Sequence, residues 1–341
     1  MKSDKQLLRE YVLQVLLEDE GGDMGAGDYG GLGLSDANVG PYGMHYGSGQ
    51  DLYKIFVKPF TDVVQTAAGK TKETSAKAQT LLKVAFETLA TTLIPVLRDD
   101  YSEIFAKEKQ QVDKIRQQYS AVYKSNWDAF KDKDLVVAAF MYSPAAFITT
   151  KFAQHSPKVA ASLISIVSGG TLDPWLAKVK DKFGIDSSGP SRSAHEGVLR
   201  EDGENKPKLD VGHVLSNKKV IEKLSNSPTA KQMQNIGQAM VRETLGSVFK
   251  KAQGVLSANS LQDLQTKTGV KLKGMDKLQQ IPEQERKVSE QTLLTGAKKS
   301  MKAFYVKNLE GQVEEALKSG VPESHPYISD YRKVISKIKA L

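Results

Sequence analysis

Hydrophobic residues recur with the period of an α-helix along most of the chain, and the first such stretch covers residues 1–20. Its apolar positions share one helical face, formed by Leu7, Leu8, Tyr11, Val12, Val15 and Leu16. Gly21 and Gly22 follow, and glycine readily adopts the left-handed conformation that ends a helix. The pattern predicts a short amphipathic helix whose six apolar residues are candidates for docking on a partner.

The period disappears in residues 21–50, which hold eleven of the 27 glycines of the chain. Aspartates and tyrosines are interspersed among these glycines. Glycine-rich sequence of this kind behaves as flexible chain, because glycine restricts the backbone least. We therefore predict a flexible, acidic tether, which together with the preceding helix forms an N-terminal arm.

The helical period returns at residue 51 and predicts a helical core domain over residues 51–186. Apolar stripes indicate helices over residues 52–64, 76–97 and about 99–130. Pro95 lies in the last turn of the second helix, and we expect it to bend or end that helix because proline has no amide hydrogen. Asp99 or Asp100 would then cap the third helix.

Within this domain, residues 135–150 and 159–172 contain no charged side chain, and a polar corner separates them. This arrangement predicts a central apolar helical hairpin, kinked at Pro144. The hairpin either forms the centre of the core or inserts into a membrane, as in pore-forming proteins. Each segment is shorter than the roughly 20 apolar residues that cross a bilayer, which favours the core.

Residues 187–208 are rich in Gly, Pro, Ser, Glu and Asn and predict an interdomain linker. A basic helical C-terminal domain follows over residues 209–341. Its apolar positions indicate helices over residues 217–225, 228–257, 259–267, 283–319 and 325–340. Alternation with the period of a β-strand is scarce throughout, so we predict an all-α, multi-helix protein.

Charge is unevenly distributed along the chain. The formal net charge is +8, yet residues 1–50 contain three basic and eight acidic residues, which leaves +13 for the remainder. Thirteen basic residues face five acidic ones between positions 206 and 280. Candidates for contact with a polyanion there are Lys218, Lys219, Lys250, Lys251, Lys271 and Lys273. The alternative is an ordinary solvated surface, and Phe249 is the exception in a region almost without aromatic residues for base stacking.

No arrangement of residues with catalytic or metal-binding spacing is evident. The chain has no cysteine, and none of its five histidines lies three or four residues from another. Gly25, Gly27 and Gly30 match a dinucleotide-binding pattern, but that pattern requires a preceding strand, where a helix is predicted here. We therefore expect no catalytic residue, no cofactor and no metal, and hence no enzyme.

The opening sequence MKSDKQLLREYVLQVLLEDEGG resembles the N-terminal segments of proteins carried inside the heads of large tailed phages of the T4-like kind. That resemblance implies targeting to the assembling prohead core through a leucine-rich helix. It also implies cleavage after glutamate within Leu or Ile, any residue, Glu. Glu18, at the boundary between helix and tether, and Glu201, in the predicted linker, fit that pattern.

The leading hypothesis is a non-enzymatic phage virion or prohead-associated structural protein, part of the capsid during assembly in the host cytoplasm. Its arm would join other phage structural proteins or further copies of itself. A basic face would meet DNA, without sequence preference, or an acidic partner. The alternative is a membrane-active DNA-ejection or pore-forming protein that uses the hairpin of residues 135–172.

Overall fold

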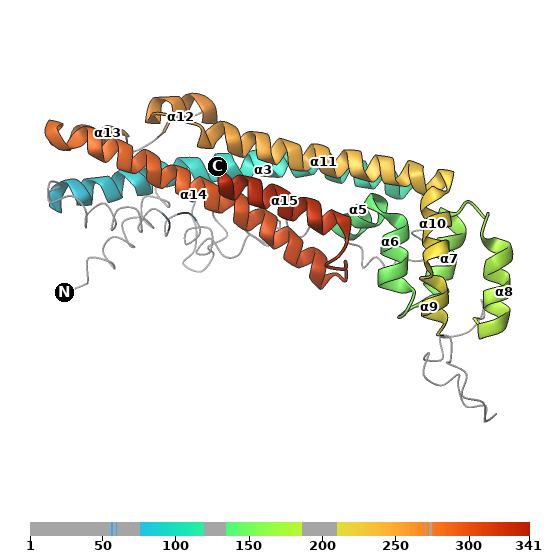
Figure 1. The fold of residues 1–341 in the computed structure, drawn as a ribbon. Coiled ribbons are helices and arrows are strands. Elements are labelled where there is room, and N and C mark those ends of the chain that lie inside the picture. Colours follow the sequence, from blue (N-terminus) through green and yellow to red (C-terminus); the bar gives the residue numbers. More distant parts are fainter. Residues whose placement is uncertain are drawn as a thin grey trace, which may run out of the picture. The chain divides into compact units, whose positions relative to one another are not determined.

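The computed structural model describes residues 76–118, 134–185, 210–269, 271–272 and 275–341, together with Phe56 and Pro59. All regular structure in these ranges is helical, without a strand, which confirms the predicted all-α fold (Figure 1). The predicted N-terminal helix, the tether and the linker of residues 187–208 lie outside the described residues.

The helices follow one another with short connections where the chain is described. They are α3 (Ala76–Gln118), α5 (Asp134–Tyr142), α6 (Pro144–Phe147), the π-helical turn η3 (Ile148–Phe152), α7 (Pro157–Val167), α8 (Asp173–Phe183), α9 (Val211–Leu215), α10 (Lys218–Asn226), α11 (Pro228–Leu256), α12 (Leu261–Thr268), α13 (Met275–Gln279), α14 (Glu283–Lys318) and α15 (Pro326–Ala340).

The chain forms two compact units. Unit 1 comprises Met1–Ala106, Gly246–Gln312 and Val334–Leu341, and unit 2 comprises Lys107–Leu245 and Val313–Lys333. The segments before and after the predicted linker, α7–α8 and α9–α10, both belong to unit 2. The predicted linker itself is not described, so the predicted domain boundaries remain a prediction.

The core of unit 1 contains an aromatic cluster between α3 and α14. Tyr101 packs on Phe105, with ring centroids 4.8 Å apart, and its ring also meets Phe304 and Tyr305 at 6.1 and 6.5 Å. All four rings are buried. Large aromatic side chains contribute more buried area than any other residues, so this cluster anchors α14 on α3.

The prediction that a helix ends at Pro95 is wrong, because α3 continues through this proline as one helix of 43 residues. Buried side chains continue on both sides of it, with Leu93 before and Leu97 and Tyr101 after, at the four-residue spacing of one helical face. Burial of this stripe outweighs the loss of one backbone hydrogen bond. The same argument removes the predicted cap at Asp99 or Asp100, which lie inside α3.

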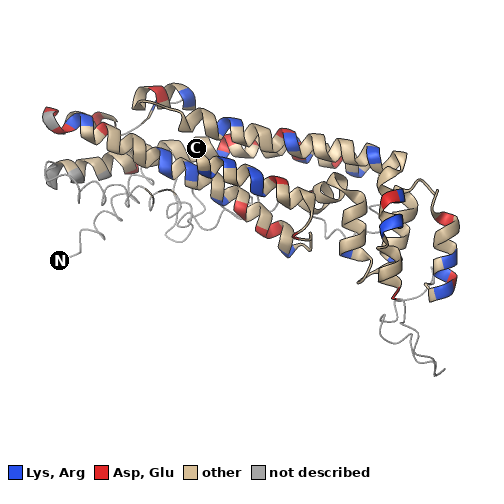
Figure 2. Cartoon of the chain, in the orientation of Figure 1, with Lys and Arg blue, Asp and Glu red and all other residues tan. Residues whose placement is uncertain are grey.

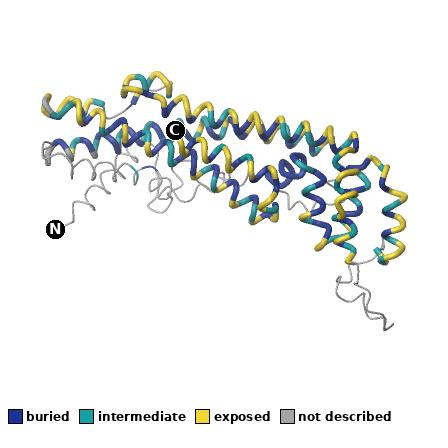
Figure 3. Tube along the Cα trace, viewed as in Figure 1, coloured by how far each residue is buried: buried dark blue, intermediate teal, exposed yellow. Residues whose placement is uncertain are grey.

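Unit 2 turns sharply at Pro144, which confirms the predicted kink. The axis of α5 and that of α6 with η3 differ by 116°. Ser143 leaves the helical conformation between them, and Pro144 begins α6, a position where its missing amide hydrogen costs nothing. All nine residues of α5 are buried, so this corner forms the centre of unit 2 (Figure 3).

Glycines allow α11 to approach this corner closely and α9 to approach the turn that follows η3. A Cβ atom on Gly237 of α11 would lie 2.4 Å from the carbonyl carbon of Met141 and 2.6 Å from the amide nitrogen of Tyr142. A Cβ on Gly212 of α9 would lie 3.0 Å from the Cα of Gln154. Backbone therefore packs directly against backbone at both places, and at Gly237 any larger residue would force a helix to move.

Two segments have the length and hydropathy of a membrane span. One is residues 80–117 of α3, whose most apolar stretch is 47 % buried within the protein, and the other is the bent pair of α5 with α6–η3. Core helices of water-soluble proteins also have this composition. The burial of α5, of most of α6 and η3 and of one face of α7 favours the core alternative for the predicted hairpin.

Candidate polyanion interface

The predicted docking and processing residues cannot be placed. Leu7, Leu8, Tyr11, Val12, Val15 and Leu16, as well as Glu18 and Glu201, lie outside the described residues. Lys273 does too. The five remaining lysines of the predicted polyanion contact are all exposed, and the structure divides them between the two units.

Lys218 and Lys219 open α10 in unit 2. The side chain of Asn217 caps this helix, since its Oδ1 accepts a hydrogen bond of 2.9 Å from the amide of Lys219. The N-terminus of a helix carries partial positive charge, so two lysines in the first turn are unfavourable for α10 itself. An external anion at this end would be favoured both by the lysines and by the helix.

Lys250, Lys251 and Lys271 belong to unit 1, and their surroundings differ. The ammonium of Lys251 forms an ion pair of 2.9 Å with Asp100 of α3. The charge of this lysine is therefore partly neutralised by the protein itself. Lys250, its neighbour on α11, and Lys271, which follows α12, are exposed. Within unit 1 the predicted residues therefore differ in how far their charge is already paired.

Further lysines of unit 1, none of them among the predicted polyanion contacts, lie on α14 and α15, and most have contacts that join these helices to each other or to α11. The ammonium of Lys302 donates to the carbonyl oxygen of Lys339 at 3.1 Å. Lys339 and Lys307 pair with the two carboxylate oxygens of Glu310 at 2.8 and 3.6 Å. The ammonium of Lys337 lies 5.9 Å from the ring centroid of Phe249 on α11. We call Lys302, Lys307, Lys337 and Lys339 the lysine cluster, and Figure 2 shows basic residues on both helices near the label C.

Two groups of unit 2 with shifted pKa values, Tyr142 and Asp330, serve packing instead. The phenol of Tyr142, at the end of α5, donates to Asp330 of α15. Burial and this carboxylate raise the pKa of Tyr142 to about 12. Burial alone would raise the pKa of Asp330, but hydrogen bonds from Lys333 and Tyr142 lower it. The pair ties α15 to the corner at Pro144.

His325 is the buried histidine of the described residues, only 2 % exposed. Its Nδ1 accepts a hydrogen bond of 3.2 Å from the amide of Tyr327 in the first turn of α15, so the ring acts as a helix cap. The ring of Phe147 meets it edge to face at 6.1 Å. Burial lowers the pKa of His325 to about 4, so the imidazole is neutral at pH 7.

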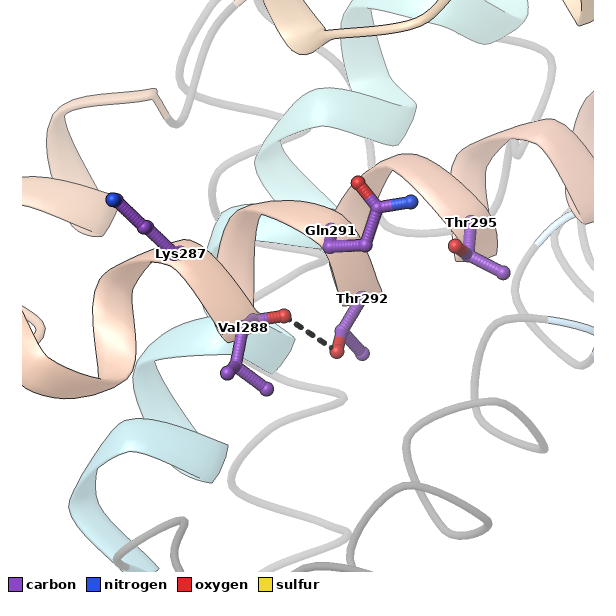
Figure 4. A pocket seen from close by; sticks show the side chains of 5 residues that line it. All are labelled: Lys287, Val288, Gln291, Thr292 and Thr295. Carbon is purple, nitrogen blue, oxygen red and sulfur yellow. Dashed lines mark hydrogen bonds between the residues drawn. The ribbon is translucent and has the colours of Figure 1, made fainter.

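A shallow hollow on α14 offers little for catalysis or ligand capture. It is lined by Lys287, Val288, Gln291, Thr292 and Thr295, all from one helix (Figure 4). The hydroxyl of Thr292 donates to the carbonyl oxygen of Val288 at 2.8 Å and is thereby occupied. Within the described ranges, no three His, Asp or Glu side chains are grouped so that they could hold a metal ion.

We compared the chain with models of protein families, with curated protein sequences and with solved structures, and none of the three comparisons gives a match.

Proposed function

We propose that this protein is a non-enzymatic structural component of a phage virion or prohead, assembled through its N-terminal arm. A lysine-bearing surface of the helical body would face DNA or an acidic neighbour. The observation that carries the polyanion part is the exposure of the predicted lysines together with the lysine cluster. The assembly part rests on the amphipathic pattern of residues 1–20 and on the resemblance of that segment.

The distribution of charge supports different roles for the N-terminal arm and for the remainder of the chain. Residues 1–50 carry −5, whereas the remainder carries +13. A protein with a basic surface gathers polyanions by long-range attraction, and an acidic arm on the same chain competes with them. The arm would thereby keep the lysines from binding nucleic acid before the protein reaches its assembly.

The experiment uses purified particles and two forms of the protein. Mass spectrometry of the particles should find the chain and its mature N-terminus, which tests both virion residence and cleavage after Glu18. A gel-shift series with the full chain and with a chain lacking residues 1–50 should show weak, sequence-independent DNA binding at low salt. We expect the shorter form to bind more tightly, because the competing carboxylates are gone.

Three results would contradict the proposal. Absence of the chain from particles would refute the virion assignment, and absence of low-salt binding by both forms would refute the polyanion contact. Binding that survives high salt would contradict a purely electrostatic contact, because each neutralised phosphate makes affinity fall with salt.

The membrane-active alternative has one observation in its favour, the hydropathy of α3 and of the bent pair. Its test is leakage from lipid vesicles together with hydrogen exchange of residues 135–172. Leakage with fast exchange in that region would favour membrane insertion, whereas intact vesicles and slow exchange would favour the core.

A further inference from the structure

We infer that the lysine cluster of unit 1 holds the phosphate backbone of a duplex nucleic acid. The inference rests on the proposed function, since it names the surface and the partner of the polyanion contact proposed there. Three kinds of observation carry it: how firmly the ammonium groups are held, the excess of positive charge, and the chemistry of lysine.

The ammonium groups are positioned before any ligand binds. Lys302 donates to the carbonyl oxygen of Lys339, and the ammonium of Lys337 lies over the ring of Phe249. An ammonium has three N–H donors, and each of these contacts uses at most one of them. The remaining donors can reach phosphate oxygens, and less side-chain entropy is lost on binding than for freely rotating lysines.

The cluster has more positive charge than its internal partner neutralises. Two of its lysines share the carboxylate of Glu310, at 2.8 and 3.6 Å, so the four lysines and this glutamate sum to +3. Like charges gathered on one surface repel each other, and this cost falls when a polyanion binds. An incoming phosphate chain therefore gains from both attraction and relief of repulsion.

Stabilisation of a helix end explains only part of the cluster. Lys337 and Lys339 lie in the last turn of α15, where cations interact favourably with the helix dipole. Lys307, however, lies in the interior of α14, and its side chain is 62 % exposed. Its positive charge therefore does not stabilise either end of α14 through the helix dipole.

The residue types point to phosphate rather than to bases. Lysine is a compact charge that binds phosphate without fixed geometry, whereas readout of base edges typically uses the planar or amide groups of Arg, Asn and Gln. Phe249 is half-buried and lies beneath the ammonium of Lys337, so its face is already occupied and does not offer a stacking platform. Binding without sequence preference follows.

Two variants of the full chain with equal charge test the inference. One carries K302Q, K307Q, K337Q and K339Q. The matched control carries K158Q, K178Q, K223Q and K231Q, all at exposed positions of unit 2. Fluorescence anisotropy of a random-sequence duplex is measured across a salt series, after circular dichroism has established that both variants melt like the wild type.

We expect the cluster variant to bind at least about tenfold more weakly than the wild type at low salt, with the control within about twofold. The slope of log affinity against log salt should fall in magnitude by about 3–4 for the cluster variant, since each phosphate that is no longer neutralised accounts for about 0.9. E310Q, which removes the carboxylate that competes with phosphate, should bind several-fold more tightly. Should the fourfold variant fail to fold, E310Q tests the inference instead, and unchanged binding by this variant would refute it.

Equal weakening by both fourfold variants would overturn the inference while leaving the proposed polyanion contact intact. A wild-type chain that binds no duplex at low salt would overturn both. Poly-L-glutamate, included as a competitor, separates the partners. Tighter binding of that polymer than of the duplex, abolished in the cluster variant, would assign the cluster to an acidic protein and refute the nucleic-acid assignment.

Discussion

Two prolines in different units have opposite effects on their helices. Pro95 in unit 1 lies inside α3, which continues through it for 43 residues, about 65 Å. Pro144 in unit 2 stands at a corner where the axis turns by 116°. The chemistry of the two rings is the same, so the difference comes from their surroundings.

The surroundings of the two prolines differ in how the buried side chains are arranged. Around Pro95 the buried residues Leu93, Leu97 and Tyr101 lie four positions apart, and a continuous α-helix keeps all three on one face. Around Pro144 all of the preceding segment and most of the following one are buried, and a corner lets both of them reach the core. A proline thus permits a break, and packing decides whether it occurs.

The largest expected effect tests whether the corner depends on close backbone contact. Gly237→Ala places a Cβ atom 2.4 Å from the backbone of Met141, so α11 or α5 must move. We expect a loss of about 3 kcal/mol in the free energy of unfolding, measured by denaturant titration.

Gly246→Ala is the matched control on the same helix, since a Cβ there meets no atom within 4 Å. It should stabilise by about 0.5–1 kcal/mol, because alanine favours helix more than glycine does. Similar results for the two variants would mean that α5 and α11 move apart at little cost. The close packing at the corner would then not explain why this segment differs from α3.

The next effect depends on pH and concerns the cap of α15 beside the corner. The folded pKa of His325, about 4, lies below the usual 6.5. The unfolded chain therefore binds a proton first as the pH falls. Stability is complete above pH 6.5 and is lost between pH 6.5 and 4, by about 3 kcal/mol in total.

His325→Asn keeps an acceptor for the amide of Tyr327 and removes the titrating group. Unfolding curves of the two proteins at several pH values isolate the contribution of this histidine. The difference between them should shrink toward pH 4. A difference that does not change with pH would show that the imidazole is not buried in the neutral form.

A third test compares the prolines directly. Pro95→Ala restores an amide hydrogen for the carbonyl oxygen of Thr91 and should raise the free energy of unfolding by about 1–3 kcal/mol. Pro144→Ala should change it by less than about 1 kcal/mol, since proline suits the first position of α6. Thermal melts followed by circular dichroism suffice. Stabilisation by Pro144→Ala instead would mean that the ring strains the corner.

The smallest expected effect concerns the hydrogen bond that ties α15 to the corner. Tyr142→Phe removes the donor to Asp330 and should cost about 1–2 kcal/mol, because a hydrogen bond to a charged group exceeds a neutral one. Lys333 still pairs with Asp330 at 2.8 Å, which limits the loss. Chemical denaturation is the measurement, and an unchanged midpoint would show that the phenol contributes only its ring.

The sequence predicted most helices of the C-terminal half closely. The pattern over residues 228–257 corresponds to α11, Pro228–Leu256, and that over 283–319 to α14, Glu283–Lys318. Long helices with one buried face leave a clear period in the sequence. The five-residue helices α9 and α13 were not predicted, because fewer than two turns give no measurable period. Helix α8 was also missed, since it buries only Leu176 and Val179.

The candidate interface was much less predictable than the fold. Exposure of Lys218, Lys250 and similar residues follows from their charge alone. The lysine cluster instead joins side chains from α14 and α15 to Phe249 of α11, and no local pattern reports which helices pack together. The continuation of α3 through Pro95 escaped prediction for the same reason, since its cause is tertiary burial.

The π-helical turn η3, which follows α6, contains one residue more than an α-helical turn would. Its backbone bond runs from the amide of Ala153 to the carbonyl of Ile148, one residue further than in an α-helix. A π-helical turn absorbs one extra residue within a helix, so removing a residue there would restore the α-helical bond pattern and change which side chain lies at this turn. Lys151 now donates to the carbonyl oxygen of Ser319 at 2.7 Å, beyond the end of α14. Among sequences that share this fold, a single-residue gap between Ile148 and Ala153 would thus accompany the loss of a lysine at this position.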